Sequence, residues 1–383
     1  MNPQVASQPE NPMVRLDAIV AALRAAGQPL YDLGIGDPQE PTPAFIVEAL
    51  KQAVPAVSRY PRAAGTPELR SAIAGYLQRR FTVQLDPERE ILPSAGAKEA
   101  IFHFPLLLID PAAERRAVIY PDPGYAIYER GTAFAGGEPM PQPLTAETGY
   151  LVDLDALPEN LLRRTALFWL CSPQNPTGAV APRAYLEKLV GLSARFGFLI
   201  AADECYADIY FDAPPPSILE VTRRGVIAFH SLSKRSGMTG MRSGFMAGDA
   251  DCISALKSFR PACGTASPDF IQAAATAAWR DDVHVAERRA TFAHKRQIFR
   301  ELFADLGLSA VGDAGLYLWV RLPPGTQDDE SFARDLAERA GIIVQPGCFL
   351  GEAGRGYVRV ALSPTVAQCA AAAAAWRTAA KGH

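Results

Sequence analysis

Residues 226–234 read VIAFHSLSK, an apolar run that ends in Ser231, Ser233 and Lys234. A short, continuously apolar run bounded by polar residues is typical of a buried strand in a parallel sheet. An amine held at the end of such a strand is partly desolvated, which makes it easier to deprotonate. A Schiff-base nucleophile needs that property. The stretch therefore predicts a buried strand of an α/β protein with a reactive lysine at its end.

The other lysines lack this setting. Four fall in amphipathic helical stretches, one opens a helix and one lies in the tail: Lys51, Lys188, Lys257, Lys295, Lys98 and Lys381. Taken alone, the pattern Ser-x-Ser-Lys is more often a surface turn. The prediction for Lys234 therefore depends on the motifs elsewhere in the chain.

Composition narrows the class of protein. The chain has 383 residues, of which 49% are hydrophobic and 21% charged, as in a globular protein of two or three domains. A net charge of -3 gives no electrostatic reason to bind nucleic acid or an anionic membrane. We therefore expect small-molecule substrates as partners, with no nucleic acid and no membrane.

Cysteine and histidine positions argue against a metal site. The six cysteines include no CxxC pair, and the five histidines do not fall at metal-ligand spacings. The first twelve residues do not resemble a secretory signal, and no uninterrupted apolar stretch of about 18 residues occurs. We expect a soluble, cytoplasmic protein without a metal.

Strands and helices alternate through the first two thirds of the chain. Thr42-Pro43 and Thr66-Pro67 are helix-start signals, and helical periodicity also covers about 14–26. Apolar strands are predicted at 116–120, 166–171, 198–202, 226–230 and 244–247. This alternation predicts a mostly parallel central sheet with helices on both faces.

The pattern changes after about residue 268. Residues 270–305 are strongly helical, and a helix at 332–340 lies between strands at 317–322 and 357–362. We therefore predict a large domain at 40–267 and a smaller α/β domain formed by 1–39 and 268–383.

Three predicted strands end in polar clusters, and ligands bind at the carboxyl ends of strands in open α/β sheets. Asp203 follows the apolar run LIAA, so its carboxylate needs a cation, which the protonated pyridine nitrogen of pyridoxal phosphate would supply. Tyr206 and Asn175 could bind the phenolate oxygen of the same ring. The alternatives are a loop or N-cap carboxylate for Asp203 and a plain turn for the NPTG sequence that begins at Asn175.

Phosphate and carboxylate groups need donors and positive charge. The sequence SAGAKEA at 94–100 opens a helix with a glycine, a weak signal for an anion site that Ser231 and Arg242 strengthen. Arg359 lies inside the apolar strand YVRVAL, where it either forms a structural ion pair or binds the α-carboxylate of an amino acid. Tyr125 either stacks on the cofactor ring or is a core aromatic.

Taken together, these motifs resemble the class I/II aminotransferases of fold type I, the aspartate aminotransferase superfamily. The resemblance runs from LGIGDP at 33–38 to VRV at 358–360, with every motif in order. It implies a ping-pong exchange of an amino group between an amino acid and 2-oxoglutarate or glutamate, with pyridoxal phosphate as cofactor.

The resemblance also implies roles for further residues. Tyr60 matches a tyrosine that reaches the phosphate in the neighbouring subunit, so a homodimer with shared active sites is implied. Gly36 matches a glycine near the substrate carboxylate, and Gly96, Ala97 and Lys98 match the phosphate loop.

Within the superfamily, four stretches are most similar to N-succinyl-L,L-diaminopimelate aminotransferases of lysine synthesis: 41–46, 203–211, 233–236 and 240–249. The segment 259–265 departs from the more aromatic sequence expected there. A broad-range aspartate, alanine or aromatic aminotransferase and a carbon-sulfur lyase remain alternatives. A regulatory pyridoxal-phosphate module is disfavoured because the chain has no basic helix-turn-helix extension.

Overall fold

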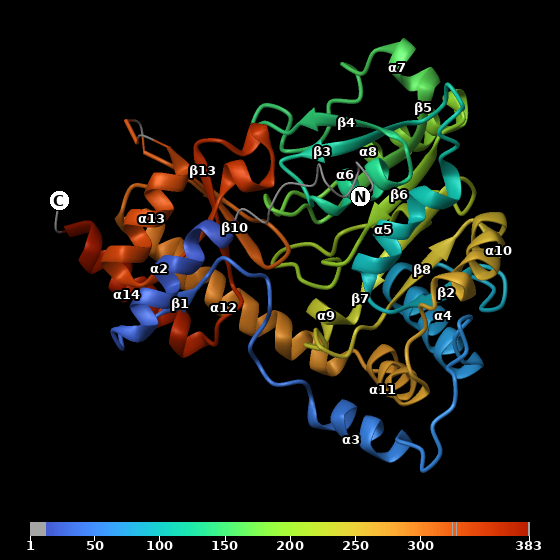
Figure 1. The fold of residues 1–383 in the computed structure, drawn as a ribbon, viewed down its shortest axis with the longest axis horizontal. Coiled ribbons are helices and arrows are strands. Elements are labelled where there is room, and N and C mark those ends of the chain that lie inside the picture. The colour runs from blue at the N-terminus through green and yellow to red at the C-terminus, as the bar shows by residue number, and fades with distance from the viewer. Residues whose placement is uncertain (1–12, 324, 327, 382–383) are drawn as a thin grey trace.

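The computed structural model describes residues 13–323, 325–326 and 328–381, which form three sheets. The largest sheet has seven strands in the order β2-β8-β7-β6-β5-β3-β4 (Figure 1). Their bounds are β2 Ile91–Ser94, β3 Ala117–Asp122, β4 Glu138–Pro143, β5 Thr165–Cys171, β6 Leu199–Asp203, β7 Val226–Ser231 and β8 Gly244–Gly248.

This sheet is mostly parallel, as the sequence predicts. Strands β7, β6, β5, β3 and β4 pair in parallel, and β8 is antiparallel to both of its neighbours, β7 and β2. Because β8 is antiparallel to both, β2 runs in the same direction as β7. Six strands therefore place their carboxyl ends at one edge of the sheet, and the predicted fold class is confirmed.

Both faces of the sheet are buried because alternate residues of each strand enter different cores. In β7, Val226 and Ala228 belong to one apolar cluster, whereas Ile227 and Phe229 belong to the other. Helices supply the rest of each cluster. The first face is covered by α4 Pro67–Phe81, α8 Arg183–Phe196 and α11 Asp269–Arg280, and the second by α5 Ala97–Leu108, α6 Ile127–Phe134 and α10 Ala250–Phe259.

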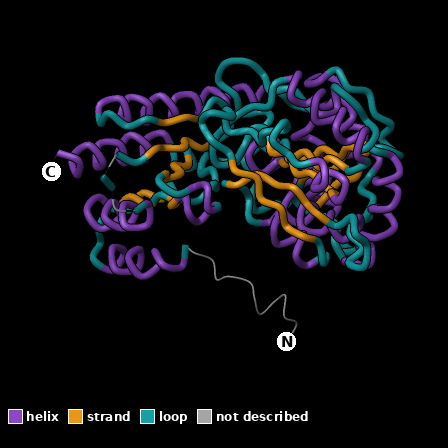
Figure 2. Tube along the Cα trace, turned by 90° about the horizontal axis from the view of Figure 1, so that it is seen from above, coloured by secondary structure: helices purple, strands orange, loops and turns teal. Residues whose placement is uncertain are grey.

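A smaller α/β part lies beside this sheet (Figures 1 and 2). Its four-stranded sheet has the order β12-β13-β10-β9, and β1 pairs with β11 in a separate two-stranded sheet. The strand bounds are β1 Tyr31–Asp32, β9 Ala310–Val311, β10 Tyr317–Arg321, β11 Ile342–Ile343, β12 Gln345–Pro346 and β13 Tyr357–Ala361. The accompanying helices are α2 Val14–Ala25, α12 Val283–Asp305, α13 Asp329–Ala340 and α14 Val366–Lys381.

The structure corrects several predicted elements. Strands β2 and β4 were not predicted, and both carry prolines, which weaken a strand signal. The helical stretch 270–305 is two helices, because α11 ends at Arg280 and α12 begins at Val283. Lys234, expected at the end of a strand, lies three residues beyond it in the short helix α9 Leu232–Arg235. A further pair of short helices, α3 Ala44–Ala53 and α7 Glu159–Arg164, completes the α-helices of the described residues.

The predicted domain boundary at residue 267 stays a prediction. Helix α11 follows that boundary, yet its buried residues Ala274, Ala278 and Trp279 join the core of the seven-stranded sheet. Residues 1–12 of the predicted small domain lie outside the described part of the chain. Among the described residues, no helix combines the length and apolar character that crossing a membrane requires.

Candidate active site

The sheet brings the polar ends of distant strands into line. Ser94 of β2 and Ser231 of β7 both pair with Gly244 of β8, so the three residues lie side by side across the sheet. One strand further along, Asp203 ends β6, and the NPTG turn follows the end of β5. The carboxyl ends that the sequence predicted to form a site do meet at one edge.

Lys234 projects from helix α9 toward the N-terminal segment. Its Nζ donates a hydrogen bond to the backbone carbonyl of Gly36. Ser231 begins this helix, and its hydroxyl accepts a hydrogen bond from the Ser233 amide at 3.1 Å. The turn is thus fixed by its own cap, and the lysine is brought to the predicted substrate glycine.

Asp203 is buried, and no described residue forms an ion pair with it. Its Oδ2 accepts a hydrogen bond from the Tyr128 hydroxyl at 2.7 Å, and its Oδ1 accepts one from the Cys205 amide at 3.2 Å. Burial raises the pKa of Asp203 even though these hydrogen bonds oppose the shift. A carboxylate in this position is stabilised by a cation that arrives with a ligand.

A glycine turn and an arginine lie in contact at the start of helix α5. Gly96 begins helix α5 with a φ of +85°, and no side chain of the described residues caps that helix. A Cβ at Gly96 would lie 2.8 Å from the Cζ of Arg242, so the guanidinium packs directly against this turn. Arg242 also approaches Ser233, with its Nη1 3.4 Å from Oγ. Free backbone amides and a guanidinium in contact suit a phosphate.

An ion pair between Glu99 and Arg260 lies against the turn at Gly96. Glu99 accepts two hydrogen bonds from Arg260, at 3.0 and 2.8 Å, and one from the Ala95 amide at 2.8 Å. Although burial alone would raise the pKa of Glu99, hydrogen bonds from His103 and Arg260 hold it below its usual value. Arg260 lies in the segment 259–265 that departs from the expected sequence, and through Glu99 it braces the turn at Gly96.

Arg359 points from β13 toward the NPTG turn. Its Nη1 donates to the Asn175 Oδ1 at 2.9 Å and its Nη2 donates to the Gly34 carbonyl at 2.7 Å. The expected alternative, a carboxylate partner in a structural ion pair, does not occur among the described residues. Because Arg359 occupies the amide oxygen of Asn175, the amide nitrogen is left to donate elsewhere.

Two tyrosines complete the side nearest the small sheet. The Tyr206 hydroxyl lies 3.3 Å from that of Tyr317. Burial, followed by the nearby Tyr317, raises the pKa of Tyr206 well above its usual value. A Cβ at Gly36 would collide with the Tyr317 hydroxyl, so only glycine fits this close approach.

The remaining predicted residues differ in their surroundings. The Tyr125 ring packs edge-on against Tyr128 at 5.7 Å, and the exposed Lys98 ammonium lies 6.0 Å from its centroid. Ala97 is buried at the first position of α5. Tyr60 is fully exposed and makes no contact with these residues within its own chain that the structure shows.

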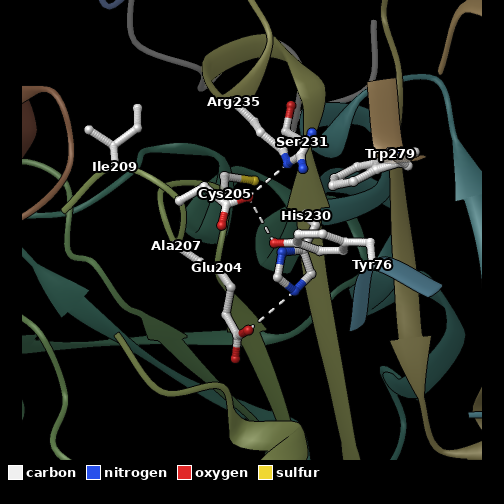
Figure 3. Close-up of a pocket in the computed structure, with 10 residues that line it drawn as sticks. Tyr76, Glu204, Cys205, Ala207, Ile209, His230, Ser231, Arg235 and Trp279 are labelled. Atoms are coloured by element: carbon white, nitrogen blue, oxygen red, sulfur yellow. Dashed lines mark hydrogen bonds and ion pairs between the residues drawn. The ribbon is translucent and has the colours of Figure 1, made fainter. Parts of the chain in front are cut away.

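Figure 3 shows a small cavity behind this edge, where Glu204 and His230 face each other with Oε2 and Nε2 3.2 Å apart. Arg235 lies on its other side and forms an ion pair with Asp208 at 2.8 Å. Although burial would raise the pKa of Asp208, Arg235 and Arg80 hold it below its usual value. Glu204 and His230 directly adjoin Asp203 and Ser231 in sequence, so this network supports the strand ends that face the site.

These features fit pyridoxal phosphate. The buried Asp203 lacks a cation, the Gly96 turn faces Arg242, and the Nε of buried Arg359 has no hydrogen-bond partner among the described residues. A pyridinium, a phosphate and an α-carboxylate would meet these three needs. Among the described residues, no group of three or more His, Cys, Asp or Glu is arranged to hold a metal ion.

Comparison with known proteins agrees with this reading. The model of the family described as aminotransferase class I and II matches residues 28–375. The chain belongs to the class I and II aminotransferases. It is therefore a transaminase that uses pyridoxal phosphate and exchanges amino groups between amino acids and keto acids.

Relatives of this aminotransferase have similar lengths. The chain is 39% identical over 356 residues to the LL-diaminopimelate aminotransferase of Desulforudis audaxviator, covering 91% of this chain and 90% of the relative. An aminotransferase structure from Neisseria meningitidis is 35% identical with a TM-score of 0.91, covering 99% of this chain and all of that one. A probable N-succinyldiaminopimelate aminotransferase from Thermus thermophilus is 29% identical with a TM-score of 0.89, covering 96% and 99%.

Four residues of the site were missed by sequence reasoning: Tyr128, Glu99, Arg260 and Tyr317. Tyr128 lies in the first turn of α6, three residues after Tyr125, which precedes the helix, and its amide donates to the Tyr125 carbonyl at 3.0 Å. Glu99 lies within the SAGAKEA motif at 94–100, but its partner Arg260 is 161 residues away in sequence. Tyr317 had no signal beyond that of a core aromatic in a strand.

Proposed function

We propose that this aminotransferase takes the amino group of a diaminopimelate-type donor at a site built around Lys234, and passes it to 2-oxoglutarate. The proposal depends on one observation: the Lys234 amine and the Arg359 guanidinium both bind the short segment 34–36. Lys234 donates to the carbonyl of Gly36, and Arg359 donates to that of Gly34, two residues earlier. A proton acceptor and a carboxylate binder this close together suit an α-amino acid.

Each residue has a task that its contacts support. Arg359 binds the α-carboxylate as a planar fork, and Asn175, fixed by Arg359, presents its amide nitrogen to the cofactor's phenolate oxygen together with Tyr206. In the first half of the exchange the Lys234 Nζ would carry the proton from the donor Cα to the cofactor, and in the second half it would carry a proton back to the Cα of the new amino acid. Asp203 would hold positive charge on the ring nitrogen, while Gly96, Ala97, Lys98, Ser231, Ser233 and Arg242 would hold the phosphate.

Pyridoxal phosphate, when bound, supplies an aldehyde for reversible attachment of amines and a ring that accepts electrons. Tyr125 would pack on one face of that ring. Tyr60 would reach the phosphate of a second copy of the chain, which its full exposure on this copy supports. We therefore propose a homodimer in which each active site takes one tyrosine from the partner.

Lys234→Ala tests the core of the proposal. We expect this variant to lose the visible absorbance of the attached cofactor and at least about 1,000-fold in turnover, because no other described lysine contacts Gly36. Lys257→Ala is a matched control, since Lys257 contacts the Glu88 carbonyl on the molecular surface. Full activity in the Lys234 variant, or borohydride trapping on another lysine, would refute the assignment.

The donor is proposed from the relatives. Several that are 36–39% identical carry the name LL-diaminopimelate aminotransferase, which supports a diaminopimelate donor and a place in lysine synthesis. The N-succinyl form indicated by the sequence stretches is the second candidate, supported by the Thermus structure. The two donors differ at the distal amine, which is cationic in the free form and neutral in the acylated one.

A donor panel with 2-oxoglutarate distinguishes them. It should include LL-diaminopimelate, N-succinyl-LL-diaminopimelate, aspartate, alanine, acetylornithine and an aromatic amino acid. We expect one diaminopimelate compound to exceed the rest in kcat/KM by at least about tenfold, or about 1.4 kcal/mol. A smaller margin would indicate a broad-range aminotransferase. Release of ammonia and pyruvate from cysteine without a keto acid would indicate a lyase.

A further inference from the structure

Tyr317 lies where the substrate side of the site meets the cofactor side. It is the first residue of β10, and only 5% of it is exposed. Its hydroxyl is 3.3 Å from that of Tyr206, and its ring centroid is 4.1 Å from the Cζ of Arg359. Tyr317 therefore contacts both Arg359, assigned to the substrate carboxylate, and Tyr206, assigned to the cofactor.

The ring contact is built into the strand register. Tyr317 pairs with Ala361 of β13, and Arg359 is two residues before Ala361, so the two side chains are diagonal neighbours on one face of the sheet. Arg359 uses Nη1 and Nη2 to bind Asn175 and Gly34. A ring against the guanidinium face limits its tilt and leaves Nε, which has no hydrogen-bond partner among the described residues, available to a carboxylate.

The hydroxyl contact crosses to the larger sheet. Tyr206 follows the end of β6, and its ring packs edge-on against Tyr317 with centroids 5.6 Å apart. The Gly36 backbone lies so close to the Tyr317 hydroxyl that a Cβ could not be accommodated. The hydroxyl is thus confined between the N-terminal segment and Tyr206.

We propose that Tyr317 is a positioning residue with two separable tasks. Its ring holds the Arg359 guanidinium in the plane that binds the α-carboxylate, and its hydroxyl orients the Tyr206 hydroxyl toward the cofactor. The inference rests on the proposed roles of Arg359 and Tyr206.

Two variants separate the tasks. Tyr317→Phe keeps the ring and loses the hydroxyl, so we expect the KM for the amino donor to stay within about twofold. Apo-enzyme should bind pyridoxal phosphate roughly fivefold more weakly, and the pH midpoint of the bound cofactor's visible absorbance should move. Tyr317→Leu loses both contacts, so it should show the same cofactor changes and, in addition, a KM raised by at least about fivefold.

Tyr185→Phe is the matched control, because its hydroxyl binds the Val152 carbonyl away from the site. This control should leave the KM, the cofactor affinity and the pH midpoint unchanged, and thermal unfolding of the apo-proteins reports whether each variant folds.

The inference is overturned if folded Tyr317→Leu retains the wild-type KM, or if folded Tyr317→Phe retains both the affinity and the midpoint. A wild-type enzyme without the visible absorbance or transaminase activity would instead overturn the proposed function and this inference with it.

Discussion

At the scale of single residues, Asp203 shows how burial prepares a site for its ligand. An unfolded aspartate titrates near pH 3.9, whereas burial raises the pKa of Asp203 in the folded chain. Well below pH 3.9 the carboxyl is protonated in both states, and its burial as a charge costs no stability. As the pH rises from the unfolded pKa toward the higher folded pKa, the unfolded state ionises first, and the folded apo-protein loses stability.

Asp203→Asn should therefore gain stability relative to wild type as the pH rises from about 4 to 7, measured on both apo-proteins by chemical unfolding. With pyridoxal phosphate bound, wild type should instead be more stable than Asp203→Asn, because only the carboxylate can pair with a positive charge on the ring nitrogen. A stability difference that does not change with pH would contradict this explanation.

Arg359→Lys should lose binding of the α-carboxylate. A lysine ammonium cannot bridge the Asn175 amide and the Gly34 carbonyl as the planar fork does. We expect kcat/KM to fall about 100-fold, or about 2.7 kcal/mol, mainly through the KM of the amino donor. Arg355→Lys is the control, since Arg355 is an exposed partner of Glu352, and it should change kcat/KM by less than twofold. Equal effects of the two changes would refute the assignment.

Residue identities within local motifs could be predicted from the sequence. Asp203 ends an apolar strand, Lys234 and Asn175 follow one within four residues, and the parallel sheet explains why such ends meet. The partners Tyr128, Arg260 and Tyr317 could not be predicted, because each is brought to the site by packing between segments distant in sequence. Aromatic or charged side chains in such segments carry no local sign of what they will contact.

At the scale of elements, the start of helix α5 depends on a glycine. Gly96→Ala would place a Cβ against the Arg242 guanidinium and strain a backbone with a φ of +85°. We expect a loss of about 1–2 kcal/mol in the free energy of unfolding and at least about tenfold weaker cofactor binding to the apo-enzyme.

Gly191→Ala is the matched control within helix α8, where a Cβ would meet nothing within 4 Å. It should stabilise the protein by up to about 1 kcal/mol and leave cofactor affinity unchanged. Unchanged cofactor affinity in Gly96→Ala would argue against a phosphate at this turn.

Element prediction succeeded where hydrophobic pattern and caps agreed. Thr66 begins helix α4 with the following proline, and its hydroxyl accepts from the Leu69 amide at 3.3 Å, as the start signal indicated. Thr42-Pro43 marked the start of α3 to within one residue, since the helix begins at Ala44. Strand β4 was missed because its sequence EPMPQP lacks the β-branched residues that mark strands.

At the scale of the whole molecule, the proposed dimer makes a prediction about mixed subunits. Tyr60→Ala and Lys234→Ala should each be poorly active, because the first lacks a group for the partner's site and the second lacks its own amine. A heterodimer would contain one site with Lys234 from one subunit and Tyr60 from the other. Random mixing should therefore restore roughly a quarter of wild-type activity.

Unfolding and refolding the two variants together, and separately as controls, provides the measurement. Activity of the mixture equal to the mean of the separately refolded variants would argue that each site is complete within one chain. Light scattering of the wild-type protein provides an independent measure of the number of subunits.

Helix α12 connects the two parts of the molecule through side chains on one of its faces. Near its start the His284 Nε2 lies 2.9 Å from the Ser236 hydroxyl, two residues after Lys234. Eleven residues later the Lys295 Nζ donates to the Leu362 carbonyl, just beyond the strand that carries Arg359. These anchor points are about 16 Å apart along a rigid rod. A tilt of about 5° about the first anchor would displace the second by about 1.4 Å, so any tilt of α12 would shift the chain just beyond the Arg359 strand relative to the turn that carries Lys234.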